Sequence, residues 1–254
     1  MSSPDLAFFR LGGLPLFAAG DDLAGIILAA LVDAGLTLQP GDVLAVAQKI
    51  ISKAEGQTVD LGTVEASHEA RQLAAETDKD PRMVELILRE STRVVRSRPG
   101  VIIVQHRLGV ILANAGIDRS NVAGSEDQVL LLPQDPDASA RSLRDAISER
   151  SGIAPGVLVV DSIGRPWRLG TTGFAIGAAG VAVIEDLRGT RDLYARPMQV
   201  AEVAPADSVA AAAVLLMGEG AEGTPVVLIR GLPAPAEEQP AAAVLRPPHE
   251  DLFQ

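Results

Sequence analysis

The chain has 254 residues, of which 22 are Lys or Arg and 33 are Asp or Glu, so its formal net charge is −11. This acidic balance argues against non-specific nucleic-acid binding, which needs a basic surface to neutralise phosphates. The sequence contains no Cys and three His. Disulfide bonds, thiolate zinc sites and Cys nucleophiles are therefore excluded, and a bound metal is expected to be a hard cation held mainly by oxygen ligands.

The two ends of the sequence give expectations about location and domain organisation. No basic start is followed by a long apolar run, and the apolar stretches 174–184 and 209–217 are shorter than the roughly 20 residues that span a bilayer. We therefore expect a cytoplasmic protein that does not bind membranes. Residues 233–254 contain five prolines among Ala, Glu and Gln. This composition favours a mobile tail behind a folded domain over 1–232, with a docking arm for a partner subunit as the alternative.

Between residues 6 and 232, segments with helical apolar spacing alternate with short apolar runs. Helix starts are marked by Asp22 and by Asp-Pro pairs at 80–81 and 135–136. The adjacent strands expected around 92–113 break a strict βαβ alternation, which favours an α+β, or mixed α/β, fold over a doubly wound sheet. In chain order we expect a helix from 22, a strand at 42–47, a helix from 81 to about 91, strands at 101–104 and 110–113, a helix from 136 to about 150, a strand at 157–160 that ends at Asp161, a helix at 207–217 and a strand at 225–229.

Lysine is the rare cation of this chain, with three copies against 19 arginines. Two of the three, Lys49 and Lys53, follow the strand expected at 42–47. A strand end that presents ammonium groups and small polar side chains suits a phosphate, because ammonium is a compact point charge. The alternative is a solvated turn, which the spacing alone slightly favours.

Two short polar segments after apolar strands offer oxygen ligands. In the segment 114–121, Asp118 and Asn121 accompany a glycine that lets a ligand approach closely, although an Asx-capped turn uses the same residue types. In the segment 159–165, Asp161 is followed by a hydroxyl and a glycine, an arrangement typical of magnesium sites.

Arg165 and Arg168 flank the single tryptophan, Trp167. The two guanidinium groups are suited to clamp an anionic substrate. The alternative is a buried Trp packed under two surface arginines. His106 lies between two expected strands, where a structural role is favoured over contact with a substrate.

Several common motifs are missing from the sequence. No Gly-Lys dipeptide is present, so there is no Walker-type loop, and no strand–turn–helix GxGxxG marks a dinucleotide site. GxSxG and HExxH are also absent. The residues alone therefore suggest a divalent-metal, phosphoryl-transfer or phosphate-binding site on another scaffold, without naming a substrate.

Segments spread along the chain together resemble one known family, the coenzyme F420-0:L-glutamate ligases, also called F420:γ-glutamyl ligases. The resemblance covers roughly residues 10–232, in one order and without large gaps. It is carried by Leu14-Pro15 with Gly20-Asp-Asp-Leu23, Gly41-Asp-Val, Ala47-Gln-Lys-Ile-Ile-Ser-Lys-Ala-Glu-Gly56, Arg107-Leu-Gly, Ala115-Gly-Ile-Asp-Arg-Ser-Asn-Val122, Leu131-Leu-Pro-Gln-Asp-Pro-Asp-Ala-Ser-Ala140, Asp161-Ser-Ile-Gly-Arg-Pro-Trp-Arg168 and Gly177-Ala-Ala-Gly180.

This resemblance implies a cytoplasmic ligase that joins L-glutamate to the phospholactyl carboxylate of coenzyme F420-0 and in some cases adds further γ-linked glutamates. It implies GTP as co-substrate, two sites for Mg²⁺ or Mn²⁺, and K⁺. It also implies a family-specific fold that forms an intertwined homodimer. Some relatives carry a C-terminal flavin-dependent reductase domain, which we expect this chain to lack.

The resemblance also carries roles to individual positions. Ser162 stands where members often have Thr, which keeps the hydroxyl, and Glu219 stands where a Gln can occur. An anionic acceptor gives Arg165, Arg168 and Arg107 a function in an acidic protein. The alternatives are a γ-glutamyl ligase for another anionic acceptor and a non-catalytic nucleotide- or deazaflavin-binding protein. The implied GTP contacts are Leu14, Pro15, Leu16, Phe17, Gln48, Lys53 and Asn121, the first metal's ligands Asp118 and Asp161, the second's Ser162 and Glu219, and the catalytic set Asp118, Asp161 and Arg165.

Overall fold

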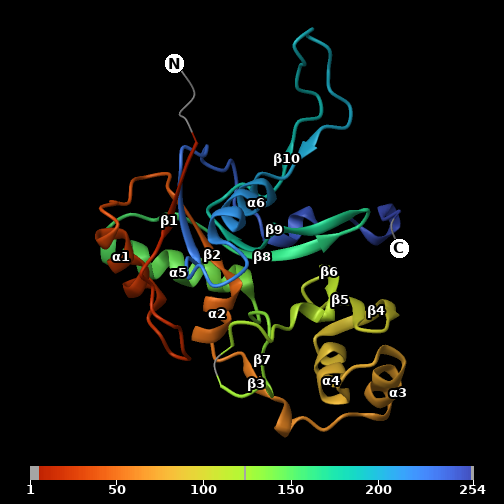
Figure 1. The fold of residues 1–254 in the computed structure, drawn as a ribbon. Coiled ribbons are helices and arrows are strands. Elements are labelled where there is room, and N and C mark those ends of the chain that lie inside the picture. Colours follow the sequence, from red (N-terminus) through yellow and green to blue (C-terminus); the bar gives the residue numbers. More distant parts are fainter. Residues whose placement is uncertain (1–5, 123, 253–254) are drawn as a thin grey trace.

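A five-stranded mixed sheet forms the centre of the larger lobe in the computed structural model, which describes residues 6–122 and 124–252 (Figure 1). Neighbouring strands are antiparallel except for the parallel pair β2 and β8. The mixture of parallel and antiparallel pairs agrees with the expected α+β class. The strands, in spatial order, are β1 (Ala7–Leu11), β12 (Val226–Arg230), β2 (Val43–Ala47), β8 (Gly156–Arg165) and β9 (Arg168–Ala179).

Successive residues of the central strands point to opposite faces of this sheet and are apolar on both, so both faces are covered. Leu44 and Val46 face a core shared with helices α1 (Leu23–Asp33) and α5 (Pro136–Ser151). Val43 and Ala45 face a second core under helix α6 (Pro205–Met217). Helix α2 (Gln48–Ala54) follows β2 directly.

Glycines let the two covering helices approach β9. A β-carbon at Gly173 would overlap the carbonyl of Ala210 on α6, and one at Gly177 would overlap the carbonyl of Pro136 on α5. Glycine is therefore required at both positions for close packing of a helix on the sheet.

Residues 58–132 build a smaller lobe below the sheet in Figure 1. Its helices and three-stranded sheet enclose a separate apolar core that includes Val84, Ile87, Ile102 and Val104. A two-stranded ribbon of β3 and β7 joins it to the rest of the chain. The elements are β3 (Thr58–Asp60), 3₁₀-helix η1 (Leu61–Thr63), α3 (His68–Thr77), α4 (Pro81–Arg89), β4 (Ser91–Arg98), β5 (Val101–His106), β6 (Ile111–Ala113), 3₁₀-helix η2 (Asn114–Gly116) and β7 (Gln128–Leu130).

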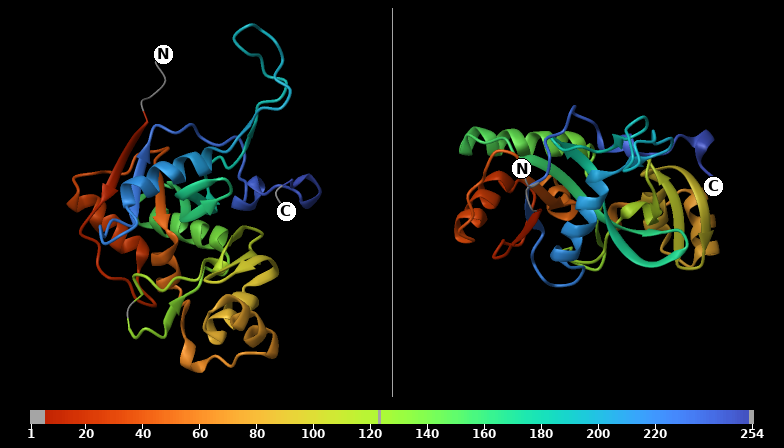
Figure 2. Two further views of the ribbon diagram at one scale, coloured as in Figure 1. Left: turned by 45° about the vertical axis from the view of Figure 1, so that its right-hand side comes forward. Right: turned by 90° about the horizontal axis from the view of Figure 1, so that it is seen from above.

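An arm projects from the larger lobe, away from the smaller one (Figures 1 and 2). Its base is a short ribbon of β10 (Glu185–Asp186) and β11 (Glu202–Val203). Beyond this base, Leu193, Tyr194 and Val200 expose most of their surface.

The C-terminal segment contains two 3₁₀-helices, η3 (Ala241–Val244) and η4 (Pro248–Glu250). The Gln239 side chain accepts hydrogen bonds from the backbone of Val183 and Ile184, at 3.1 and 3.0 Å. Ala241 is buried against the core under α6. Whether residues 233–254 are mobile in solution stays a prediction, to be tested against these contacts.

Most of the expected helices and strands are confirmed, and their caps agree with the sequence signals. The carboxylates of Asp22, Asp80 and Asp135 each accept a hydrogen bond from the first turn of their helix. None of the helices within 6–122 and 124–252 has the length and apolar character needed to cross a bilayer.

Two boundary predictions are wrong. The strand expected to end at Asp161 continues to Arg165, because its polar second half pairs with β9 in a hairpin. The segment after β2, interpreted as a strand end or a solvated turn, is the helix α2.

Candidate active site

The candidate site lies where the parallel pairing of β2 with β8 ends. Ala47 on β2 lies opposite Val160 on β8. The next residues, Gln48 and Asp161, therefore lie at the same edge of the parallel pair. Ligands of α/β sheets bind at the carboxyl ends of parallel strands, so this edge is the expected location for a site.

The smaller lobe supplies Asp118 through a left-handed turn. Asn114, Ala115 and Gly116 have φ angles of 52°, 55° and 64°. The first two carry a Cβ in this sparsely populated region, which costs of order 1 kcal/mol each and needs support from the surrounding structure. The Asn114 side chain accepts a hydrogen bond from the Ile102 amide at 3.2 Å. Asp118 then exchanges two backbone hydrogen bonds of 2.9 Å with Leu130, which fixes its position.

One oxygen of Asp118 receives two side chains from α2. The Gln48 amide donates to Oδ2 at 2.8 Å, and the Lys49 ammonium forms an ion pair with the same oxygen. Gln48 and Ser52 are buried, and the Ser52 hydroxyl donates to Oε1 of Gln48 at 3.0 Å. Because its carbonyl oxygen is engaged by Ser52, the Gln48 amide is fixed with its N–H toward Asp118.

Asp161 and Ser162 project from β8 beside this group. The Ser162 amide donates to Oδ1 of Asp161 at 2.8 Å, and the Ser162 hydroxyl donates to Glu219, in the loop after α6, at 3.1 Å. Burial, followed by the negative charge of Asp118, raises the pKa of Asp161 to about 7, against the opposing effect of Lys49. A nearby cation would stabilise the ionised form of a carboxyl group in this environment.

Lys53 and Asn121 close the other side of the site. The Lys53 ammonium donates to the Asn121 carbonyl at 2.6 Å, and the Asn121 side chain donates to the Gly220 carbonyl at 3.3 Å. Burial, and then the positive charge of Lys49, lowers the pKa of Lys53. The two lysines therefore share one partly desolvated positive region next to two aspartates.

The residues fit a divalent cation that completes its ligand shell with phosphate and water. Asp118 and Asp161 are electrostatically coupled, and Ser162 and Glu219 supply a neighbouring hydroxyl and carboxylate. Across the described residues, no three His, Cys, Asp or Glu side chains converge in a closed metal cage. Such an open set agrees with Mg²⁺, which is usually held by one or two carboxylates together with substrate phosphates.

Within the segment Leu14–Phe17, Phe17 shares a core with Ile50 and Ile51 of α2. Phe17 is buried in the core and Leu14 packs against it, whereas Leu16 is 95% exposed. Further along the same loop, the Gly20 amide donates to the carbonyl of Ala54, the last residue of α2, at 2.8 Å. The loop that continues from the predicted GTP contacts 14–17 thus meets the C-terminal end of the helix that carries Gln48 and Lys53.

The predicted arginine clamp is not assembled with the carboxylates. Arg165 follows Asp161 by four strand residues, roughly 13 Å along β8, and donates to the Gly170 carbonyl at 3.0 Å. Trp167 is 87% exposed, so the alternative of a buried tryptophan is wrong. A role for Arg165 toward an acceptor stays a prediction.

Arg107 and His106 have structural partners. Arg107 donates to Glu90 at 2.9 Å and to the carbonyl of Pro133 at 3.1 Å. His106 is fully buried, accepts a hydrogen bond from the Leu108 amide at Nδ1, and places Nε2 3.4 Å from Glu90. These contacts support the structural role favoured for His106.

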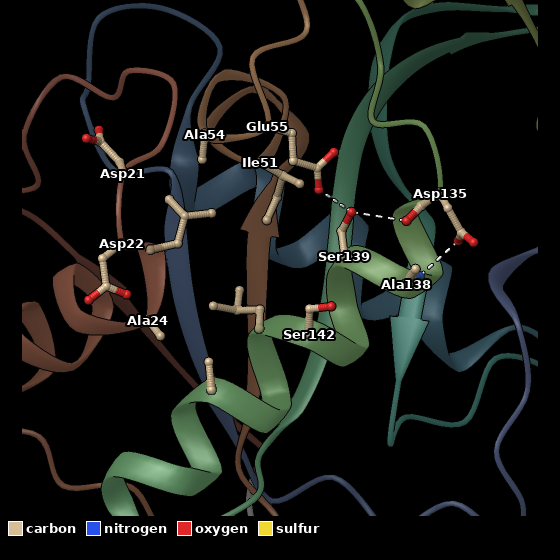
Figure 3. Close-up of a pocket in the computed structure, with 13 residues that line it drawn as sticks. Asp21, Asp22, Ala24, Ile51, Ala54, Glu55, Asp135, Ala138, Ser139 and Ser142 are labelled. Carbon is tan, nitrogen blue, oxygen red and sulfur yellow. Dashed lines mark hydrogen bonds between the residues drawn. The ribbon is translucent and has the colours of Figure 1, made fainter.

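A cavity of about 470 Å³ lies between α1, α2 and α5, and neither Asp118 nor Asp161 lines it (Figure 3). Its carboxylates already hold protein groups. Asp22 pairs with Arg150, Asp135 accepts from the Ala138 amide, and Glu55 accepts from the Ser139 hydroxyl. We therefore interpret this cavity as a gap between packed helices and not as a ligand site.

The model of the F420-0:γ-glutamyl ligase family matches residues 13–231. This chain belongs to that family. It is 46% identical to the coenzyme F420:L-glutamate ligase of Methanopyrus kandleri over 239 residues, which cover 92% of each chain. It is 42% identical to the protein of that name from Methanothermobacter thermautotrophicus, over 98% of this chain and 99% of the relative, and 41% identical to that of Archaeoglobus fulgidus, over 97% and 95%.

Within this family member, the structure brings Gln48, Lys53, Asp118, Asn121 and Asp161 into one region, together with Ser162 and Glu219. Sequence reasoning missed the part played by Lys49. Its proximity to Lys53 in the sequence marked the pair as a phosphate cradle, but no signal indicated that Lys49 pairs with an aspartate 69 residues away.

Proposed function

We propose that this protein joins L-glutamate to the phospholactyl carboxylate of coenzyme F420-0, with GTP as co-substrate, in F420 biosynthesis. The substrate class rests on the similarity to coenzyme F420:L-glutamate ligases that match over nearly the whole chain. The observation that carries the chemistry is the convergence of Asp118 and Asp161 beside Lys49 and Lys53. Two carboxylates next to two ammonium groups suit a nucleotide triphosphate that arrives with a cation.

Amide formation from a carboxylate and an amine in water requires an activated carboxyl group. In the proposed reaction, an oxygen of the acceptor carboxylate attacks the γ-phosphorus of GTP, and the bond to the β-phosphate oxygen breaks to release GDP. The glutamate amine then attacks the acyl carbon of the acyl phosphate, loses a proton, and expels inorganic phosphate. Repetition on the glutamate γ-carboxylate would add further residues.

Positioning and charge neutralisation supply most of the catalysis in phosphoryl transfer, so the residues act mainly as holders. Gln48, Lys53, Asn121 and the segment 14–17 would contact GTP. Asp118 and Asp161 would hold one Mg²⁺ or Mn²⁺, and Ser162 with Glu219 a second. The bound cations would neutralise developing phosphate charge, and K⁺ would assist nucleotide binding.

We further propose a cytoplasmic homodimer. The protein exposes apolar side chains on two protrusions, with Leu193 and Tyr194 on the arm and Trp167 and Leu169 at the tip of the β8–β9 hairpin. Apolar side chains gathered at protruding tips are typical of interaction surfaces. A second copy of the chain is the proposed partner.

The test is an incubation with F420-0, L-glutamate, GTP and MnCl₂, followed by mass measurement of the deazaflavin product. We expect one or more added glutamyl residues, with one GDP and one phosphate per glutamate. Omission of GTP, or its replacement by ATP, should stop the reaction. Turnover without GTP would refute the acyl-phosphate route. Binding of F420-0 and GTP with no product in any combination would favour a non-catalytic binding protein, and product with another anionic acceptor alone would favour a different γ-glutamyl ligase.

A further inference from the structure

Lys49 occupies the carboxylate that is proposed to hold a cation. Its ammonium pairs with Oδ2 of Asp118, the same oxygen that accepts the Gln48 amide. The ion pair is largely shielded from solvent, since the Lys49 and Asp118 side chains are 27% and 25% exposed. The contact is therefore more than a screened surface pair.

Lys53, one helical turn later, has a different environment. Its ammonium donates to the Asn121 carbonyl at 2.6 Å, and the contact is with an uncharged backbone group. The two lysines thus offer a matched comparison on one helix: Lys49 neutralises a carboxylate, whereas Lys53 is fixed by a loop.

We propose that Lys49 is a built-in counter-ion of Asp118 that a divalent cation must displace, and that its released ammonium then meets the nucleotide phosphates. The proposal rests on the proposed function, because it takes Asp118 as a metal ligand. With the cation absent, the ammonium offsets the repulsion between Asp118 and Asp161. With cation and GTP bound, the same ammonium has an anionic partner within reach of a flexible four-carbon stem.

The proposal predicts effects of opposite sign on two ligands. Lys49→Gln removes the competitor, so the protein should bind Mn²⁺ alone about five- to tenfold more tightly. The same variant should bind GTP more weakly, by about tenfold, because a phosphate contact is lost. If Lys49 had a merely structural role, its substitution would weaken the binding of both ligands or of neither.

The experiment is calorimetric titration of the full-length protein with MnCl₂ alone, and then with GTP in saturating MnCl₂. Lys49→Arg keeps the charge and should keep the Mn²⁺ affinity near that of the wild type. Lys53→Gln should change the affinity for Mn²⁺ alone by less than about twofold and weaken GTP binding. Thermal melts would establish that each variant is folded, and the neutral, similarly sized Lys49→Met replaces Lys49→Gln if the latter does not fold.

Each outcome decides one question. Suppose that Lys49→Gln binds Mn²⁺ no more tightly than the wild type, while Asp118→Asn binds Mn²⁺ more weakly. That result would overturn the counter-ion role of Lys49 and leave the metal site at Asp118 standing. Equal Mn²⁺ binding by wild type and Asp118→Asn would overturn the metal site and, with it, the role of Lys49. Absence of Mn²⁺ binding in both wild type and Lys49→Gln would overturn the proposal as well.

Discussion

Ala47 on β2 and Val160 on β8 are register partners, and each immediately precedes a residue of the candidate site. Their pairing places Gln48, at the start of α2, beside Asp161. The smaller lobe then adds Asp118, whose carboxylate accepts the Gln48 amide. The site thus depends on a parallel strand pair and on a lobe inserted between its two strands.

This arrangement predicts that Asp161→Asn abolishes ligation and leaves the fold intact. We expect the rate at saturating MnCl₂ to fall by roughly a hundredfold or more, because a cation contact contributes several kcal/mol in the transition state. The substitution also removes repulsion with Asp118, so the melting temperature without metal should not fall. Rate assays and thermal melts check the two halves of the prediction.

Two comparisons sharpen that test. Asp118→Asn should behave like Asp161→Asn, and the double variant should be no slower than either single one, since both residues would act on one cation. Asp33→Asn, at the exposed end of α1, should keep the wild-type rate. Normal turnover by Asp161→Asn would remove this aspartate from the site.

Much of the larger lobe could be predicted because its signals are local. Apolar periodicity and the aspartate caps located α1, α4 and α5. Helix α2 was not predicted, because it follows β2 without a loop and its N-cap, Ala47, supplies no side-chain hydrogen bond. The second half of β8 was not predicted either, since polar residues 161–165 form a strand through pairing with β9.

The individual polar residues of the site could be singled out, but their geometry could not. Asp118 and Asp161 are 43 residues apart, and only the resemblance to a family joined them before the structure did. The Lys49–Asp118 contact depends on the left-handed turn at Asn114–Gly116, whose middle residue, Ala115, belongs to a type that rarely adopts positive φ. Sequence signals for such a turn are weak when non-glycine residues form it.

Glu219 offers a graded test of the second proposed cation position. Its carboxylate accepts a hydrogen bond from Ser162, a role that a glutamine oxygen can also fill. We expect Glu219→Gln to keep activity within about tenfold and to need more MnCl₂, because an oxygen ligand remains while its charge is lost. Glu219→Ala should be slower still at every metal concentration. Equal rates for the two variants would indicate that the side chain has no ligand role.

Close packing of α6 on β9 predicts a strong effect of a single methyl group. Gly173→Ala places a β-carbon against the Ala210 carbonyl, and we expect a loss of about 1–3 kcal/mol in the free energy of unfolding. Gly164→Ala, in the adjoining strand, meets nothing within 4 Å and should be close to neutral. Urea unfolding of both variants gives the comparison. Equal stabilities would mean that the helix shifts at little cost.

Glu90 predicts an acid-sensitive contribution to stability. The contact with His106, 3.4 Å away, followed by the hydrogen bond from Arg107, holds the pKa of this carboxyl below its ordinary value. A lowered folded-state pKa contributes stability above the unfolded value near 4.3, and the contribution is lost as pH falls through the folded pKa. Glu90→Gln should therefore be less stable than wild type by about 1.5–3 kcal/mol at pH 7. Urea unfolding should show this gap narrowing below about pH 4.5, whereas a constant gap would exclude the carboxylate as its cause.

Removal of residues 233–254 decides between the mobile tail expected from composition and the contacts in the structure. A chain that ends at Leu232 loses Gln239, the shared acceptor of the Val183 and Ile184 amides, and the buried Ala241. Two amides without an acceptor, together with lost apolar burial, correspond to a few kcal/mol. For a chain of this size we expect a fall of roughly 5–10 °C in melting temperature.

A shorter truncation provides the matched control. A chain that ends at Arg246 removes η4 and keeps Gln239, η3 and Leu245, so its melting temperature should stay within about 2 °C of wild type. Gln239→Ala in the full chain should reproduce part of the loss, by about 1–3 kcal/mol, because two backbone donors lose one acceptor. If all three proteins melt with the wild type, residues 233–254 behave as a mobile tail, and the composition argument is correct. If only the chain that ends at Arg246 melts with the wild type, residues 233–246 belong to the folded domain, and the domain boundary moves beyond Leu232.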